Sequence, residues 1–61
     1  MKELFSNYCF ELVNLYKVRC GFNGDEARRY IIDMIDDVLE SYNGGYSVQS
    51  VFEEDIRSWV E

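Results

Sequence analysis

Hydrophobic residues recur every three or four positions along most of this chain, and the pattern is interrupted at two places. This spacing is typical of amphipathic α-helices, because residues three and four apart lie on the same side of a helix. Both interruptions, residues 21–24 and 43–45, contain glycines, which commonly follow the last residue of a helix. The pattern therefore predicts an all-α domain over residues 1–61, with helices at about 2–20, 24–42 and 48–60.

The first predicted helix, residues 2–20, has one apolar side and one polar side. Phe10 falls outside this division, because at about 100° per residue it projects roughly opposite the apolar side. One interpretation is a single exposed aromatic side chain, which is common on protein surfaces. The other is an anchor for a partner protein, and Phe10 is the first choice for such a contact.

Residues 24–42 form the predicted central helix. Asn23 and Glu26 have the spacing of a capping box at its start. Its apolar side covers roughly 200° of the circumference, about twice what one neighbouring helix covers. We therefore expect it to contact two helices, or one helix and a second copy of the chain. That side consists of Ala27, Tyr30, Ile31, Met34, Ile35, Val38, Leu39 and Tyr42.

The third predicted helix follows from the spacing of Val48, Phe52, Ile56 and Trp59. Its first turn can be capped by Ser47 or by Ser50, and the pattern favours Ser47. A β-strand over residues 45–52 is the alternative. We do not favour it, because no second strand-like segment is present to satisfy its hydrogen bonds.

The three apolar sides together predict one core. A domain of 61 residues is near the lower size limit for folding without a metal or disulfides, so burial must be nearly complete. The predicted core consists of Leu4, Phe5, Tyr8, Leu12, Leu15, Tyr16, Tyr30, Ile31, Met34, Ile35, Val38, Val48, Phe52, Ile56 and Trp59.

Acidic residues outnumber basic ones by 12 to 6, which gives a net charge of −6. Many are predicted on the polar sides of the second and third helices. They are either an ordinary solvated surface or a negative surface presented to a basic partner. The candidate contact residues are Asp33, Asp36, Asp37, Glu40, Glu53, Glu54 and Asp55, together with Phe10.

Several other functions are not expected. Direct nucleic-acid binding needs clustered basic residues, and the one small group, residues 17–19 with 28–29, suits capping and ion pairing better than an anion or RNA-end site. The chain has no histidine, no phosphate-binding loop and no calcium-loop pattern, so we expect no enzymatic activity, cofactor or metal.

The cysteines and the hydropathy pattern bear on the cellular compartment. Cys9 and Cys20 lie on the same predicted helix about 16 Å apart, too far for a disulfide, and we interpret them as small buried hydrophobic residues. No segment has the apolar length of a membrane span or a signal peptide. We expect a cytoplasmic protein.

Three hypotheses of function remain. The first is a small acidic module that docks on another protein and modulates or inhibits it. The second is a nucleic-acid mimic, of the type encoded by phages and mobile elements, whose carboxylates occupy a basic groove; it rests on size and charge alone. The third is a homo-oligomeric helical protein, for example a homodimer that buries surplus apolar surface of the central helix.

Overall fold

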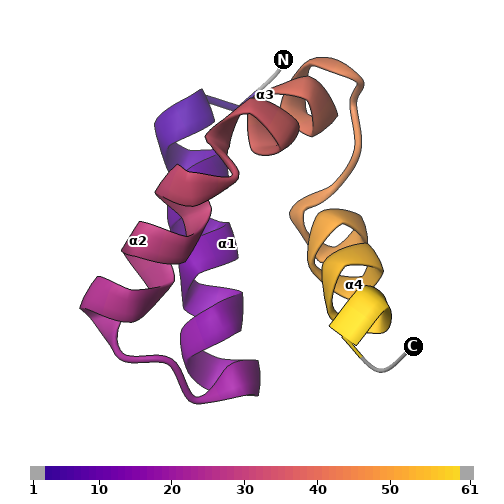
Figure 1. Cartoon of the computed structure of the whole chain (residues 1–61). Helices are drawn as coiled ribbons and strands as arrows, with labels where there is room; N and C mark the ends of the chain where they lie inside the picture. Colours follow the sequence, from indigo (N-terminus) through magenta and orange to yellow (C-terminus); the bar gives the residue numbers. More distant parts are fainter. Residues whose placement is uncertain (1–2, 60–61) are drawn as a thin grey trace.

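The computed structural model describes residues 3–59, which form four α-helices and no strand (Figure 1). They are α1 (Phe5–Cys20), α2 (Gly24–Asp33), α3 (Ile35–Asn43) and α4 (Val48–Trp59). The predicted all-α class is confirmed, and the predicted number of three helices is wrong. Residues 2 and 60, the predicted outer ends of the first and third helices, lie outside the described residues.

Helix α1 begins later than predicted and ends where predicted. Leu4 precedes it with extended backbone, φ −67° and ψ 145°, so the helical spacing does not apply to this residue. Its side chain is 68% exposed, which corrects its predicted place in the core. At the other end Gly21 adopts a positive φ of 76°, and its amide donates to the carbonyl oxygen of Tyr16. Glycine adopts this conformation without the steric cost that a side chain would bring.

The start of α2 confirms the predicted capping box. The Glu26 amide donates to Asn23 Oδ1 at 2.8 Å, and the Asn23 amide donates to Glu26 Oε1 at 3.0 Å. Asp25 and Glu26 also place negative charge beside the unpaired amides of the first turn. The second helix therefore begins at Gly24 for the reasons that the sequence indicates.

The predicted single helix over residues 24–42 is divided at Met34. This residue has φ −115° and ψ 28°, outside the helical region, and its amide donates to the carbonyl of Ile31 at 3.2 Å. Its own carbonyl accepts from the Val38 amide at 3.0 Å, which opens α3. Neither glycine nor proline is present at this point, so the break reflects how the segment packs rather than a residue that cannot be helical.

The bend between α2 and α3 keeps both helices on the core. Ile31 and Val38, on either side of it, are both buried. It also brings the Tyr42 ring against the rings of Phe5 and Tyr8, with centroids 5.1 and 5.2 Å apart. Near-perpendicular ring pairs of this kind contribute beyond the apolar area that they bury. These contacts hold the far end of α3 on the first turns of α1.

A tight turn follows α3 and is held to α1. Gly45 has φ +82°, its amide donates to the Tyr42 carbonyl at 3.2 Å, and the Tyr46 amide donates to the Ser41 carbonyl at 3.1 Å. This pair of bonds satisfies carbonyls that the end of a helix otherwise leaves without partners. The Tyr8 hydroxyl then donates to the Tyr46 carbonyl at 2.8 Å, which links α1 to the start of the last segment.

Helix α4 begins as predicted. The Ser50 amide donates to Ser47 Oγ at 3.1 Å, so Ser47 is the cap. Trp59, at the last described turn, is 46% exposed, and its predicted burial is therefore only partial. One side of its ring lies against Tyr16 and Phe22, with centroids 6.1 and 6.2 Å away.

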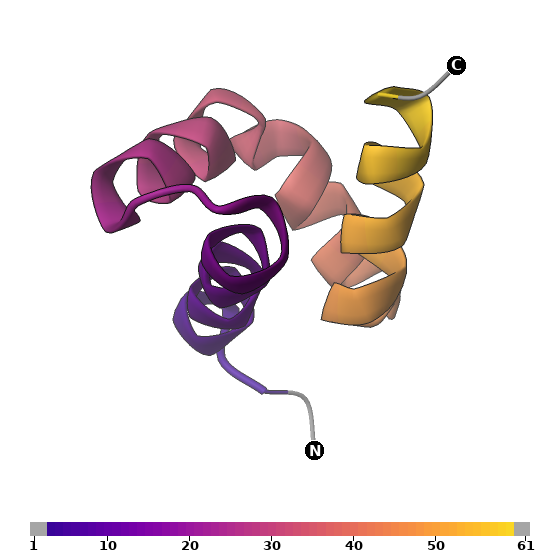
Figure 2. The ribbon, with the colours of Figure 1, turned by 90° about the horizontal axis from the view of Figure 1, so that it is seen from below.

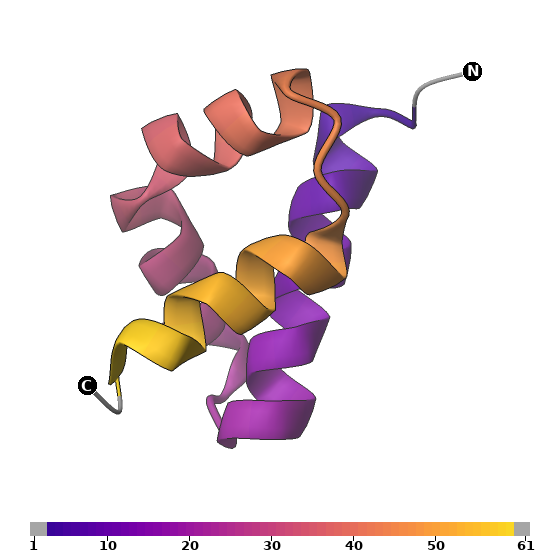
Figure 3. The ribbon, with the colours of Figure 1, turned by 90° about the vertical axis from the view of Figure 1, so that its right-hand side faces the viewer.

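Helix α1, rather than the predicted second helix, is the one on which the others pack. It contacts α2, α3 and α4. Figure 2 looks nearly along α1 and shows α2 and α4 on different sides of it, and Figure 3 shows α4 crossing it obliquely. Helix α1 also contributes more of the buried side chains than any other helix, namely Tyr8, Leu12 and Tyr16. The fully or almost fully buried residues are Tyr8, Leu12, Tyr16, Ala27, Ile31, Val38 and Phe52.

One carboxylate joins three of the helices. Oδ2 of Asp55, on α4, accepts from the hydroxyl of Tyr16 on α1 at 2.6 Å and from that of Tyr30 on α2 at 2.7 Å. The Tyr16 ring, which is fully buried, also lies 4.9 Å from that of Phe52. Hydrogen bonds to a charged acceptor are stronger than neutral ones, and a buried hydroxyl without an acceptor is costly. The Asp55 carboxylate therefore fixes α4 against α1 and α2.

Replacing this carboxylate should destabilise the fold. We expect Asp55→Ala to lower the free energy of unfolding by about 2–3 kcal/mol, because it leaves two tyrosine hydroxyls without their acceptor. Glu54→Ala, an exposed change one residue away, should alter it by less than about 0.5 kcal/mol. Urea denaturation of both variants measures the difference, and equal stabilities would show that Asp55 does not hold α4.

The same tyrosines should make stability fall at alkaline pH. Burial, reinforced by the hydrogen bond to Asp55, raises the pKa of Tyr30 to about 12 and that of Tyr16 further. In the unfolded chain tyrosine ionises near pH 10, so between about pH 10 and 12 the unfolded state binds fewer protons and is favoured. The free energy of unfolding should decrease with pH in that window, and less steeply for Tyr30→Phe. Identical slopes in the two proteins would contradict this assignment.

Candidate protein-binding surfaces

Phe10 is exposed, as its position in the sequence predicts. Its side chain is 66% exposed and lies on the side of α1 away from Tyr8 and Leu12, which face the core. It makes no ring contact with another aromatic residue of residues 3–59. A large apolar side chain exposed to solvent can contact a partner, although a single such residue does not form a hydrophobic patch.

The four predicted acidic residues of the central segment are all exposed. Asp33 ends α2, whereas Asp36 and Asp37 lie in the first turn of α3 and Glu40 follows one turn later. The break at Met34 gives Asp36 and Asp37 a structural role, because acidic groups are favourable near the amides that begin a helix. Part of this acidity thus stabilises α3, and all four carboxylates also face solvent.

The three acidic residues of α4 differ from one another. Glu53 and Glu54 are exposed, and Glu53 accepts from Gln49 Nε2 at 2.7 Å. Asp55 is half-buried and accepts from the Tyr16 and Tyr30 hydroxyls, so it is foremost a packing residue and not the exposed acidic residue that was predicted.

The fold brings acidic residues from two distant segments to one place. We call this place the α3–α4 hollow. Asp37 and Ser41 line it from α3, and Glu54 and Ser58 line it from α4. No basic residue lines it. Its other lining residues are Met34, Val38, Val51 and Asp55.

The exposed acidic residues at 33, 36, 37, 40, 53 and 54 form no ion pair within the part of the chain that the structure describes. The salt bridge there joins Arg28 to Asp25 within α2, and both side chains are largely exposed. Such a surface pair contributes little to stability. The acidic residues at 33, 36, 37, 40, 53 and 54 are therefore carboxylates exposed to solvent.

Two apolar residues of the same segment of the chain, Ile32 and Leu39, are also exposed, by 66% and 42%.

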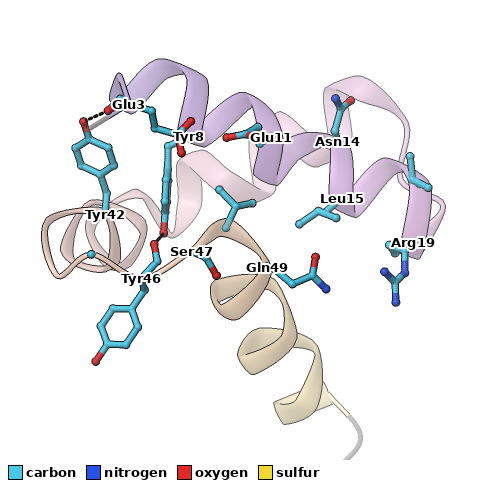
Figure 4. A pocket seen from close by; sticks show the side chains of 13 residues that line it. Glu3, Tyr8, Glu11, Asn14, Leu15, Arg19, Tyr42, Tyr46, Ser47 and Gln49 are labelled. Atoms are coloured by element: carbon cyan, nitrogen blue, oxygen red, sulfur yellow. Dashed lines mark hydrogen bonds between the residues drawn. The ribbon is translucent and has the colours of Figure 1, made fainter. Parts of the chain in front are cut away.

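A second surface was not predicted from the sequence. It is a groove between α1 and the start of α4, which we call the α1–α4 groove (Figure 4). Leu15 and Val18 of α1 and Val48 of α4 give it apolar walls, and Tyr46 stands at its edge. The groove is lined by Glu3, Tyr8, Glu11, Asn14, Leu15, Val18, Arg19, Tyr42, Gly45, Tyr46, Ser47, Val48 and Gln49.

The charges in the α1–α4 groove are separated along its length. Glu3 lies at one end, Arg19 lies at the other, and Glu11 lies between them (Figure 4). A hydrogen bond with Glu11 raises the pKa of Glu3 above its ordinary value, helped by desolvation and by the like charge of Glu11. The sequence does contain one indication of this surface. Val18, like Phe10, is an apolar residue that lies outside the apolar side of its helix.

The described residues were also compared with what a metal site or a membrane-spanning helix requires. Residues 3–59 contain no group of three or more His, Cys, Asp or Glu placed to hold a metal ion. Their helices are too short or too polar to span a membrane. Cys9 and Cys20 are free thiols, and burial raises the pKa of Cys9.

Comparison with known proteins gave no match among protein-family models, curated protein sequences or solved structures.

Removing the Phe10 ring should leave the fold intact. We expect Phe10→Ala to change the free energy of unfolding by less than about 0.5 kcal/mol, whereas Phe52→Ala, a fully buried ring, should lower it by about 3–5 kcal/mol. Thermal denaturation followed by circular dichroism compares the two. A loss of about 2 kcal/mol or more in Phe10→Ala would place that ring in the core.

Proposed function

We propose that this chain is a small non-enzymatic protein-binding module that docks on a partner with a basic surface and modulates or inhibits it. The observation that carries the proposal is the α3–α4 hollow, which Asp37 lines from α3 and Glu54 from α4, with no basic residue among its lining residues. Acidic residues on both walls of the hollow favour a cationic group of a partner at this place.

The surrounding surface supports the same function. Asp33, Asp36 and Glu40 on the central segment and Glu53 on α4 are further exposed carboxylates. Because the net charge is −6, association with a basic protein is also accelerated over distances longer than a direct contact. Phe10 offers a separate apolar contact on α1.

A nucleic-acid mimic is a special case of this function. The unpaired carboxylates of α3 and α4 favour it, because a basic groove that binds phosphates also attracts carboxylates. A mimic inhibits by occupying that groove, so double-stranded nucleic acid should compete with it. A docking module that binds elsewhere on its partner should be insensitive to nucleic acid.

Neutralising the hollow should weaken partner capture. We expect tagged Asp37→Asn/Glu54→Gln to recover about tenfold less partner than the unaltered chain from a lysate of the source cells at about 50 mM NaCl, because it removes the charge pair. Quantitative mass spectrometry of the captured proteins measures this. The matched control is Glu3→Gln/Asp25→Asn, which removes two charges away from the hollow and should capture normally.

Salt separates an interface held by charge from one anchored by Phe10, and nucleic acid separates a mimic from a docking module that binds elsewhere on its partner. Capture by a mimic should collapse at about 300 mM NaCl and on addition of double-stranded DNA or RNA, whereas an interface anchored by Phe10 should change little. Phe10→Ala should then reduce capture at both salt concentrations. Equal capture by the neutralised variant, the control and the unaltered chain would contradict a role for the α3–α4 hollow.

A further inference from the structure

The α1 side of the α1–α4 groove carries an ordered row of residues. Glu11, Leu15 and Arg19 follow one another at intervals of four, which places them along one side of the helix. Val18 lies beside this row and is 79% exposed, the highest value among the large hydrophobic side chains left in solvent. Tyr46, 62% exposed, stands at the edge of the same groove.

This row is complementary to itself. Glu11 and Arg19 are each four residues from Leu15, in opposite directions. If a second α1 is laid antiparallel with the two Leu15 side chains in contact, Glu11 of each copy meets Arg19 of the other. A two-fold axis through Leu15 thus pairs apolar with apolar and negative with positive, as a closed symmetric interface requires.

We propose that two copies of this chain associate antiparallel through their α1–α4 grooves, with Leu15 at the two-fold axis. The charge complementarity between Glu11 and Arg19 selects a second copy as the occupant of the groove. This surface lies on α1, whereas the proposed acidic contact lies on α3 and α4, so the dimer does not depend on the proposed function.

The local environment fits this arrangement. Neither Glu11 nor Arg19 forms a salt bridge within residues 3–59, and the guanidinium carbon of Arg19 lies 5.9 Å from the centre of the Phe52 ring. That contact holds Arg19 at the end of the groove. Glu3 lies beside Glu11, so an arginine from the partner subunit would also reduce the repulsion between these two carboxylates.

The dimer predicts a concentration-dependent mass. Sedimentation equilibrium of the full chain from roughly 10 µM to roughly 1 mM should show the mass rising from 7.3 kDa toward twice that value. A mass that stays at 7.3 kDa throughout this range would overturn the proposal.

Charge reversal tests the geometry. Glu11→Arg and Arg19→Glu should each raise the dimer dissociation constant by about tenfold or more, because each places like charges opposite one another twice in the symmetric dimer. The double variant Glu11→Arg/Arg19→Glu restores opposite charges and should associate nearly as the original does. The matched control is Lys17→Glu, which makes the same charge change as Arg19→Glu on the outer side of α1 and should dimerise normally.

Val18→Lys provides an independent test. The position is exposed in the monomer and tolerates substitution, whereas a lysine would be unfavourable where the dimer covers this side chain. This variant too should raise the dissociation constant by about tenfold, with an unchanged circular dichroism spectrum. A dimer that is indifferent to Val18→Lys, or single charge reversals that the double variant fails to rescue, would show that the copies meet elsewhere and would overturn the proposal.

Discussion

The arrangement of this small domain depends on one carboxylate shared by two tyrosines. Asp55 accepts from Tyr16 and Tyr30, so a single side chain of α4 is tied to both α1 and α2. The hydroxyls lie among aromatic rings, where a lost hydrogen bond is not replaced cheaply by water. In a chain with few fully buried side chains, such a polar contact specifies where the last helix docks, while the apolar contacts around Phe52 supply much of the driving force.

The bend at Met34 follows from the same need to cover α1. A straight helix over residues 24–42 would be about 28 Å long, compared with about 24 Å for the 16 residues of α1. The bend directs α3 back over the first turns of α1, where Tyr42 meets Phe5 and Tyr8. The helical hydrogen bonds lost at Met34 are offset by these contacts and by the acidic residues at the start of α3.

Local signals in the sequence predicted local structure well. Asn23 and Ser47 cap the helices that they were expected to cap, since capping depends only on neighbouring residues. The break at Met34 has no local signal, because it results from contacts with α1. Asp55 was assigned to the exposed acidic surface, although its spacing of three from Phe52 and four from Trp59 indicated the core side of α4. Phe10 and six of the seven acidic candidates were correctly predicted to be exposed. That Asp37 and Glu54 line one hollow follows only from the tertiary fold.

The molecule has two candidate binding surfaces. One consists of carboxylates on α3 and α4, and the other is the α1–α4 groove. Both exist only while α4 is docked, since α4 forms one wall of each. Nuclear magnetic resonance of the Tyr16 side chain tests that docking most directly. A docked α4 should give a slowly exchanging Tyr16 hydroxyl proton and Overhauser contacts from its ring to Phe52. Rapid exchange of that proton, without contacts between Tyr16 and α4, would contradict the central role of the Asp55 carboxylate.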